Sequence, residues 1–145
     1  MKLTSFQHLN IRCSPGDLPA IEKFYGEVLG LKSGYRPAFP FNGAWLYDGA
    51  DPVVHVGARF PEGSIGKDKH NGSIDHVAFR ATDAAAFRAR LVELGVAFEE
   101  QNVANAGYQI FLRDPVGTKL EFNFSNREAP STLAAGTIAP MQMTI

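Results

Sequence analysis

The sequence predicts an α+β fold made of two βαβββ modules. The order strand, helix, three strands occurs twice along the 145 residues. The spacing of two residue pairs repeats with it, because His8 and His55 are 47 positions apart and His76 and Glu121 are 45 positions apart. In both copies these residues fall on the face of the first and last strands that is opposite the apolar face.

The two modules are expected to form a single domain. Residues 1–62 make the first module and residues 73–124 the second, while residues 63–72, rich in Gly, Lys and Asp without periodicity, form a linker. Residues 125–145 turn to Ala, Pro, Thr and Ser, which predicts an irregular C-terminal tail.

The first module begins with a strand at residues 5–13, where apolar and polar residues alternate. The polar face of this strand carries His8, Asn10 and Arg12. A helix follows from Asp17, which suits the N-terminal cap, and ends at Gly30. Three short strands fit between residues 31 and 60. His55 lies in the last of them, between Val54 and Val56, which are expected on the packed face and leave His55 on the opposite one.

The second module repeats this order. A strand at residues 73–80 contains His76, and Asp83 caps the helix that follows. Residues 96–123 give three more strands. The apolar residues of the last strand alternate with Glu121, so this carboxylate points away from the packed face.

Composition excludes several classes of partner. The formal net charge is -1 and Lys and Arg are scattered singly, so the basic surface that nucleic acid requires is missing. No apolar run approaches the roughly 20 residues of a membrane helix, and the N-terminus lacks the apolar core of a signal peptide. Together with a lone cysteine, Cys13, which is expected to be a small buried residue, these features predict a cytoplasmic protein without a nucleic-acid or membrane partner.

The repeated residues form a candidate metal site: His8, His55, His76 and Glu121. Imidazole and carboxylate are the usual ligands of divalent transition metals, so this set would hold Zn, Ni, Co, Fe(II) or Mn with positions left for water or substrate. A single histidine on a strand is more often structural than a ligand. Four metal-binding residues at equivalent positions of a repeat favour a metal cofactor.

The chain resembles the vicinal oxygen chelate superfamily, which includes glyoxalase I, methylmalonyl-CoA epimerase, extradiol dioxygenases and fosfomycin-resistance proteins. The resemblance covers residues 4–124. Besides His8, it rests on Phe24-Tyr25 with Val28-Leu29-Gly30-Leu31, on Asp75-His76-Val77-Ala78-Phe79, and on Asp114-Pro115-Val116-Gly117-Thr118-Lys119-Leu120-Glu121. It implies that the modules form a curled mixed sheet around a metal cavity, commonly in a dimer.

Within this superfamily the chain is most similar to glyoxalase I. The likeness implies that Arg12 grips a carboxylate of glutathione and that His55 is a metal ligand. The glyoxalase pattern has a glutamate at the His55 position, so this site would carry one carboxylate instead of two. The implied reaction is a lyase or isomerase step through an enediolate or enolate chelated by the metal, with Glu121 and His55 as the catalytic residues and Glu121 moving the proton.

A small molecule, with a glutathione or CoA thioester as a candidate, is the expected substrate. Its predicted contacts are Arg12, Asn10, Trp45 and Tyr108. The tail contains several apolar residues: Leu133, Ile138, Met141, Met143 and Ile145. These are expected to cover a second copy of the chain, which predicts a twofold homodimer.

An extradiol dioxygenase is one alternative. Its iron needs the equivalents of His8, His76 and Glu121. However, Phe111 stands where that family has a tyrosine, Asp51-Pro52 stand where it has an acid–base histidine, and Tyr108 falls on the other strand face. A ligand-binding protein of the bleomycin-resistance type is another alternative, in which the aromatic segment from Tyr35 to Tyr47 lines a groove and no metal is needed.

Overall fold

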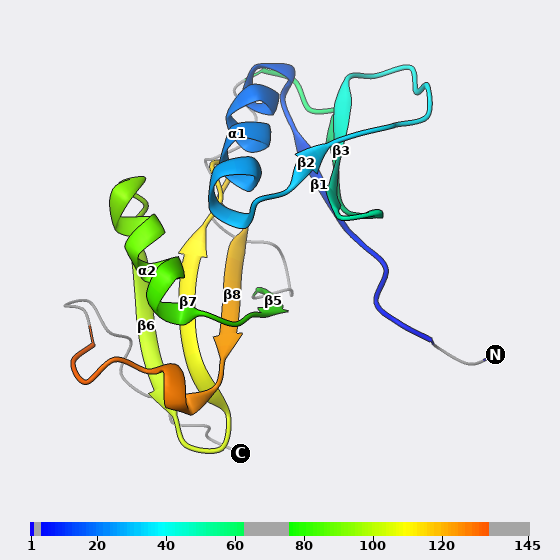
Figure 1. Ribbon diagram of the computed structural model, residues 1–145. Helices are drawn as coiled ribbons and strands as arrows, with labels where there is room; N and C mark the ends of the chain where they lie inside the picture. The colour runs from blue at the N-terminus through cyan, green and yellow to red at the C-terminus, as the bar shows by residue number, and fades with distance from the viewer. Residues whose placement is uncertain (2–3, 63–75, 134–145) are drawn as a thin grey trace, which may run out of the picture. The chain divides into compact units, whose positions relative to one another are not determined.

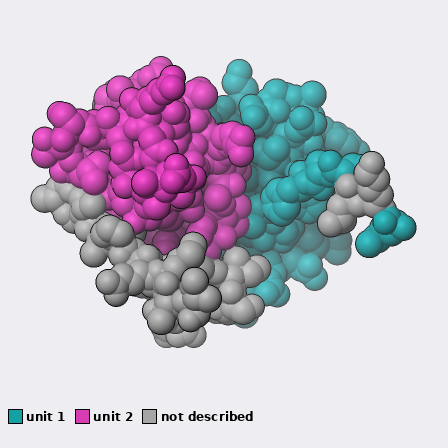
Figure 2. All heavy atoms as spheres, turned by 90° about the horizontal axis from the view of Figure 1, so that it is seen from below, with its two compact units in different colours: residues 1–69 teal, residues 70–145 magenta. Residues whose placement is uncertain are grey.

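The computed structural model of the chain describes residues 1, 4–62 and 76–133 (Figure 1). The chain divides into two compact units, residues 1–69 and residues 70–145 (Figure 2). In the described residues each unit holds one α-helix and one four-stranded mixed sheet. This confirms the α+β fold of two βαβββ modules. The expected linker, residues 63–72, lies outside the described residues, and the boundary between the units falls within it.

The first unit contains β1 (Leu9–Cys13), α1 (Leu18–Leu29), β2 (Lys32–Ser33), β3 (Gly43–Asp48) and β4 (Asp51–Ala58). The strand order in the sheet is β1-β4-β3-β2, with β1 parallel to β4 and the other pairs antiparallel. A short 3-10 turn at Pro15–Asp17 leads into α1, and Gly30 ends the helix in the left-handed conformation with φ 74°. The first strand is shorter than predicted, so His8 precedes it by one residue.

The second unit contains β5 (Val77–Arg80), α2 (Ala84–Glu93), β6 (Phe98–Val103), β7 (Gly107–Arg113) and β8 (Lys119–Phe124). Its strand order, β5-β8-β7-β6, and its strand directions repeat those of the first unit. Asp83 caps α2 as predicted, because its side chain accepts a hydrogen bond from the Ala86 amide. Beyond β8, Asn126–Glu128 form a 3-10 turn, and the apolar tail residues after Leu133 lie outside the described residues.

One face of each sheet packs against the helix of the same unit. In the first unit the packed face is lined by Ile11, Cys13, Ala44, Leu46, Val54 and Val56, all buried, and α1 adds Ile21, Tyr25 and Val28. In the second unit it is lined by Tyr108, Ile110, Leu112, Leu120, Phe122 and Phe124. The Phe87 ring of α2 lies 4.7 Å from that of Phe122. Both opposite faces are therefore left for the polar residues.

The register of β1 with β4 matches that of β5 with β8. Leu9 pairs with Val54 in the first sheet, and Val77 pairs with Leu120 in the second. His8 and His76 each come one residue before these pairs, and His55 and Glu121 each come one residue after them. The repeat predicted from spacing thus extends to the register of strand pairing. No helix in the described part of the chain is long and apolar enough to cross a membrane.

Candidate metal and substrate site

In the first unit, His8 and His55 lie against each other. Their ring centroids are 3.9 Å apart and their planes differ by 17°. The Trp45 ring also stacks on His55, at 3.9 Å and 5°. Because β4 lies between β1 and β3, His55 is held between these two neighbours, with 9% of its surface exposed.

The hydrogen bonds of His55 show which of its nitrogens can bind a metal. The Pro52 backbone forms a hydrogen bond with the imidazole. Proline has no N–H, so the Pro52 carbonyl accepts this bond and a ring nitrogen of His55 donates it. The other nitrogen, Nε2, is buried and has no hydrogen-bond partner in the described residues. Nε2 is thus the ring nitrogen left without a hydrogen-bond partner in the described part of the chain, the arrangement that a metal-ligating histidine requires.

The electrostatics of His55 favour the same neutral form. Burial lowers the pKa of His55 below its ordinary value, and the nearby His8 lowers it further, while the hydrogen bond to Pro52 raises it. A neutral imidazole at pH 7 is the form that binds metals. By its protonation and its unpartnered nitrogen, His55 fits a metal ligand.

A pocket of about 560 Å³ opens beside these rings within the first unit. Its walls include His8, Trp45, His55 and Phe6. This volume lies within the range of sites for small ligands, roughly 300 to 1,000 Å³. The aromatic walls suit the apolar part of a small molecule.

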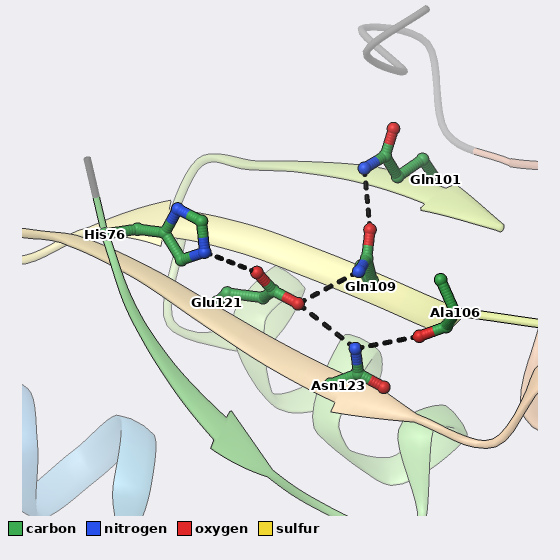
Figure 3. A network of polar contacts seen from close by, with 6 residues as sticks. All are labelled: His76, Gln101, Ala106, Gln109, Glu121 and Asn123. Atoms are coloured by element: carbon green, nitrogen blue, oxygen red, sulfur yellow. Dashed lines mark hydrogen bonds and ion pairs between the residues drawn. The ribbon is translucent and has the colours of Figure 1, made fainter. Parts of the chain in front are cut away.

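In the second unit, the His76 ring lies within hydrogen-bonding distance of the Glu121 carboxylate (Figure 3). Nε2 of His76 lies 2.8 Å from Oε2 of Glu121, and the Glu121 side chain is only 8% exposed. Oε1 of Glu121 accepts hydrogen bonds from Nε2 of Gln109 at 3.0 Å and from Nδ2 of Asn123 at 3.1 Å. Three donors therefore hold this carboxylate, and the ring of Phe111 lies edge-on to His76 with 5.9 Å between the centroids.

Each unit thus brings together one of the two predicted pairs. Among the residues that the structure describes, no group of three His, Cys, Asp or Glu side chains could hold a metal. The first unit offers His8 and His55, and the second offers His76 and Glu121. Imidazole and carboxylate are the donor types that divalent transition metals prefer.

The other predicted substrate contacts differ in position: Asn10 and Arg12 lie on the polar face of their sheet, and Tyr108 lies on the helix side of the second sheet. Asn10 pairs directly with His55 across β1 and β4, so both share the polar face. Arg12 lies on the same face, exposed, with its guanidinium 4.8 Å from the centre of the Phe60 ring. Tyr108, by contrast, is completely buried on the helix side of the second sheet, where its hydroxyl donates to Glu100. We therefore leave Tyr108 out of the site.

Sequence reasoning missed the amides around Glu121. Gln109 and Asn123 lie directly opposite each other on β7 and β8, on the face that carries Glu121. Alternation along the last strand predicts that Asn123 shares the face of Glu121, but neither amide was predicted as a site residue. They were overlooked because neutral amides are neither metal ligands of first choice nor acid–base groups.

Known proteins with this fold include enzymes and binding proteins. A family model described as the Glyoxalase/Bleomycin resistance protein/Dioxygenase superfamily matches residues 5–122. No curated protein matches the chain. Among solved structures, lactoylglutathione lyase from Agrobacterium tumefaciens is 20% identical, with 88% of this chain and 98% of that chain covered and a TM-score of 0.62.

Two further structures show the range of this fold. TnmS3, an antibiotic binding protein from Streptomyces sp. CB03234, is 21% identical, with 86% of this chain and 98% of that chain covered and a TM-score of 0.65. A mutant of the fosfomycin resistance protein FosX from Listeria monocytogenes, complexed with Mn(II) and 1S,2S-dihydroxypropylphosphonic acid, is 14% identical, with 87% and 98% covered and a TM-score of 0.65. At these identities the likeness is one of fold. The family match, which covers most of the chain, shows that the protein belongs to the Glyoxalase/Bleomycin resistance protein/Dioxygenase superfamily.

Proposed function

We propose that this protein is a metal-dependent enzyme of the glyoxalase type, which moves a proton between neighbouring carbons of a small substrate in a lyase or isomerase step. One divalent transition metal ion would be held by His8, His55, His76 and Glu121. The observation that carries the proposal is the matched register of the two pairs, because a structural repeat has no need to place metal-binding residues at equivalent positions. The unpartnered Nε2 of His55 supports it independently.

The chemistry of the residues defines their roles. A divalent ion held at this site supplies a positive charge that stabilises negative charge on the substrate, worth several kcal/mol. Glu121 moves the proton, a task that contributes roughly 10²- to 10⁴-fold to the rate. Its carboxylate is suited to this because the amides of Gln109 and Asn123 hold one oxygen in place.

The substrate contacts follow from the polar face of the first sheet. Arg12 is an exposed cation that would hold an anionic group, and Trp45 would cover the apolar part of the substrate from the pocket wall. Asn10, directly opposite His55, offers an amide for a further hydrogen bond. The fold shared with a lactoylglutathione lyase supports a glutathione conjugate, assayed as the hemithioacetal, as the first substrate class to test, and a CoA thioester as the second.

The test combines a substrate panel with one matched pair of variants. Glutathione hemithioacetals, acyl-CoA thioesters and catechols are assayed with Ni, Zn, Co, Mn and Fe(II), with oxygen uptake recorded. On the active substrate, Glu121→Gln is expected to lower kcat/KM by roughly 10²-fold or more. Glu93→Gln makes the same chemical change at a side chain that is 69% exposed on α2, and should leave activity unchanged. Wild-type activity in Glu121→Gln would refute the role of this carboxylate.

A ligand-binding function is the second candidate, because an aromatic and cationic cluster lies beside the site in the first unit. The rings of Phe39 and Phe41 stack at 5.4 Å, and the Arg36 guanidinium lies 4.7 Å and 5.1 Å from their centres. The ring of Trp45 lies 6.4 Å from that of Phe39, which is 43% exposed. The fold shared with an antibiotic binding protein supports this candidate. Purified protein that contains no metal and binds none would favour it over the enzyme.

A dioxygenase function has less support from the site residues. Phe111 lies on the Glu121 face, opposite Glu121 itself, and offers no hydroxyl there. Oxygen uptake with catechols in the substrate panel tests this function directly.

A further inference from the structure

Three amide side chains form a row across the second sheet, and two of them donate to Glu121 (Figure 3). Gln101 pairs directly with Gln109 across β6 and β7, and Gln109 pairs directly with Asn123 across β7 and β8. Nε2 of Gln101 donates to Oε1 of Gln109 at 2.6 Å, and both Gln109 and Asn123 donate to Oε1 of Glu121. These three residues are called the amide row below.

The carboxylate sets the direction of this row. An ionised carboxylate can only accept hydrogen bonds, so Gln109 must present its Nε2 to Glu121 and turn its Oε1 toward Gln101. Gln101 must then donate, which leaves its own Oε1 buried without a partner in the described residues. A buried acceptor without a donor is unfavourable. This unfavourable group lies at Gln101, the residue farthest from Glu121. The need of the Glu121 carboxylate for donors therefore sets the orientation of the amides.

The row also makes the two oxygens of Glu121 unequal. Each carboxylate oxygen has about two lone-pair positions for hydrogen bonds. Those of Oε1 are filled by Gln109 and Asn123, and Asn123 is fixed in turn because its Nδ2 also donates to the Ala106 carbonyl at 3.1 Å. Oε2 has a single partner in the described residues, His76. The remaining acceptor position of the carboxylate is therefore on Oε2.

We propose that the amide row makes Oε2 the working oxygen of Glu121, the one that ligates the metal, and that Gln109 is the positioning residue which enforces this choice. The inference rests on the proposed metal-dependent function. Without the Gln109 amide, a lone pair of Oε1 becomes available and the carboxylate can turn about its Cγ–Cδ bond. Oε2 is then not held in position before the metal binds, so metal binding must also order the carboxylate.

Metal affinity measures this role separately from catalysis. Co(II) is titrated into metal-free protein and its visible absorption is followed for the wild type and for Gln109→Leu. Loss of a hydrogen bond that orients a metal ligand weakens metal affinity by roughly 10- to 100-fold, and we expect that loss in Gln109→Leu. The matched control is Gln101→Leu, the same change one strand further from Glu121, which should weaken Co(II) binding by a much smaller factor.

Thermal unfolding of the metal-free proteins separates positioning from general damage. Gln109→Leu is expected to melt close to Gln101→Leu while binding Co(II) more weakly, and Gln109→Met replaces it if the Leu variant does not fold. Wild-type Co(II) affinity in a folded Gln109 variant, or an equal loss in Gln101→Leu, would overturn the inference and leave the proposed function standing. Absence of Co(II) binding by the wild-type protein would overturn the metal site itself, and this inference with it.

Discussion

Glu100 of β6 is a buried acid whose partners give a direct measure of how the second unit is held together. Its side chain is completely buried, and Arg88 of α2 donates to its two oxygens at 2.8 Å and 2.9 Å. The Tyr108 hydroxyl donates to it as well. Burial raises the pKa of Tyr108 above its ordinary value, and the bond to Glu100 raises it further, so this tyrosine stays a hydroxyl donor.

Arg88→Met keeps the aliphatic part of the side chain and removes both donors. Breaking a buried ion pair by removing one partner costs about 3 to 5 kcal/mol, because the other charge is left uncompensated. The Arg88 side chain is 28% exposed, so water can reach part of the site after the change. We therefore expect a loss of about 3 kcal/mol in the free energy of unfolding, at the lower end of that range.

A double variant tests the cause of this loss. Combining Arg88→Met with Glu100→Leu removes the buried carboxylate that Arg88→Met leaves unpaired. The Tyr108 hydroxyl then lacks this acceptor, which costs about 1 to 2 kcal/mol. The double variant should thus be more stable than Arg88→Met alone. Urea unfolding at pH 7, followed by circular dichroism, gives the free energies for both proteins.

The control for this experiment lies on the same helix. Arg90 pairs with Glu93 at the surface, where both side chains are well exposed, so Arg90→Met should cost no more than about 0.5 kcal/mol. An Arg88→Met protein within 1 kcal/mol of the wild type would refute this reasoning. So would a double variant whose loss equals or exceeds that of Arg88→Met.

Three further predictions concern pH, backbone and assembly. The folded state lowers the pKa of His55, so the contribution of this residue to stability is complete above the unfolded value of about 6.5 and is lost as pH falls from there through the folded pKa. Urea unfolding of metal-free protein should show a steeper loss from pH 7 to pH 5 in the wild type than in His55→Gln; equal slopes would contradict this. Gly107 has φ 110° and an added Cβ would lie 2.7 Å from the Phe124 carbonyl oxygen and against Oδ1 of Asn123, whereas Gly30, with φ 74°, has open space around it. Gly107→Ala should therefore lower the melting temperature clearly more than Gly30→Ala, which costs about 1 to 2 kcal/mol for the left-handed backbone alone; equal shifts would argue against the crowding. Light scattering at micromolar concentration should give the mass of a twofold dimer, and a monomer mass would count against that prediction.

Local chemistry explains why so much of the fold could be predicted. Asp83 caps the start of α2, and Gly30 ends α1 in the left-handed conformation. Both effects are properties of single residues. Alternation in β8 placed Glu121 on the polar face, and the two valines beside His55 did the same in β4. Features of this kind depend on near neighbours in the sequence, and the structure confirms them.

Features that depend on packing between distant segments could not be predicted. Alternation in β7 already separated Tyr108 from the face of Phe111, yet Tyr108 was predicted as a substrate contact; its pairing with Phe124 places it on the helix side. Glu100 lies in a segment of polar residues typical of a surface strand, yet it is completely buried because Arg88 reaches it from α2. Gln109, one of the donors to Glu121, likewise comes from β7, a strand that sequence reasoning did not connect to it.

A crystal structure of the zinc-loaded protein, with the metal located by anomalous scattering, tests the four-ligand site most directly. We predict that Nε2 of His55 lies about 2.0 to 2.1 Å from the zinc ion, in a shell completed by His8, His76 and Oε2 of Glu121. A fully occupied zinc site with Nε2 of His55 beyond about 2.5 Å, well outside the Zn–N range, would contradict this. The two-histidine, one-carboxylate site of the dioxygenase alternative would then fit better.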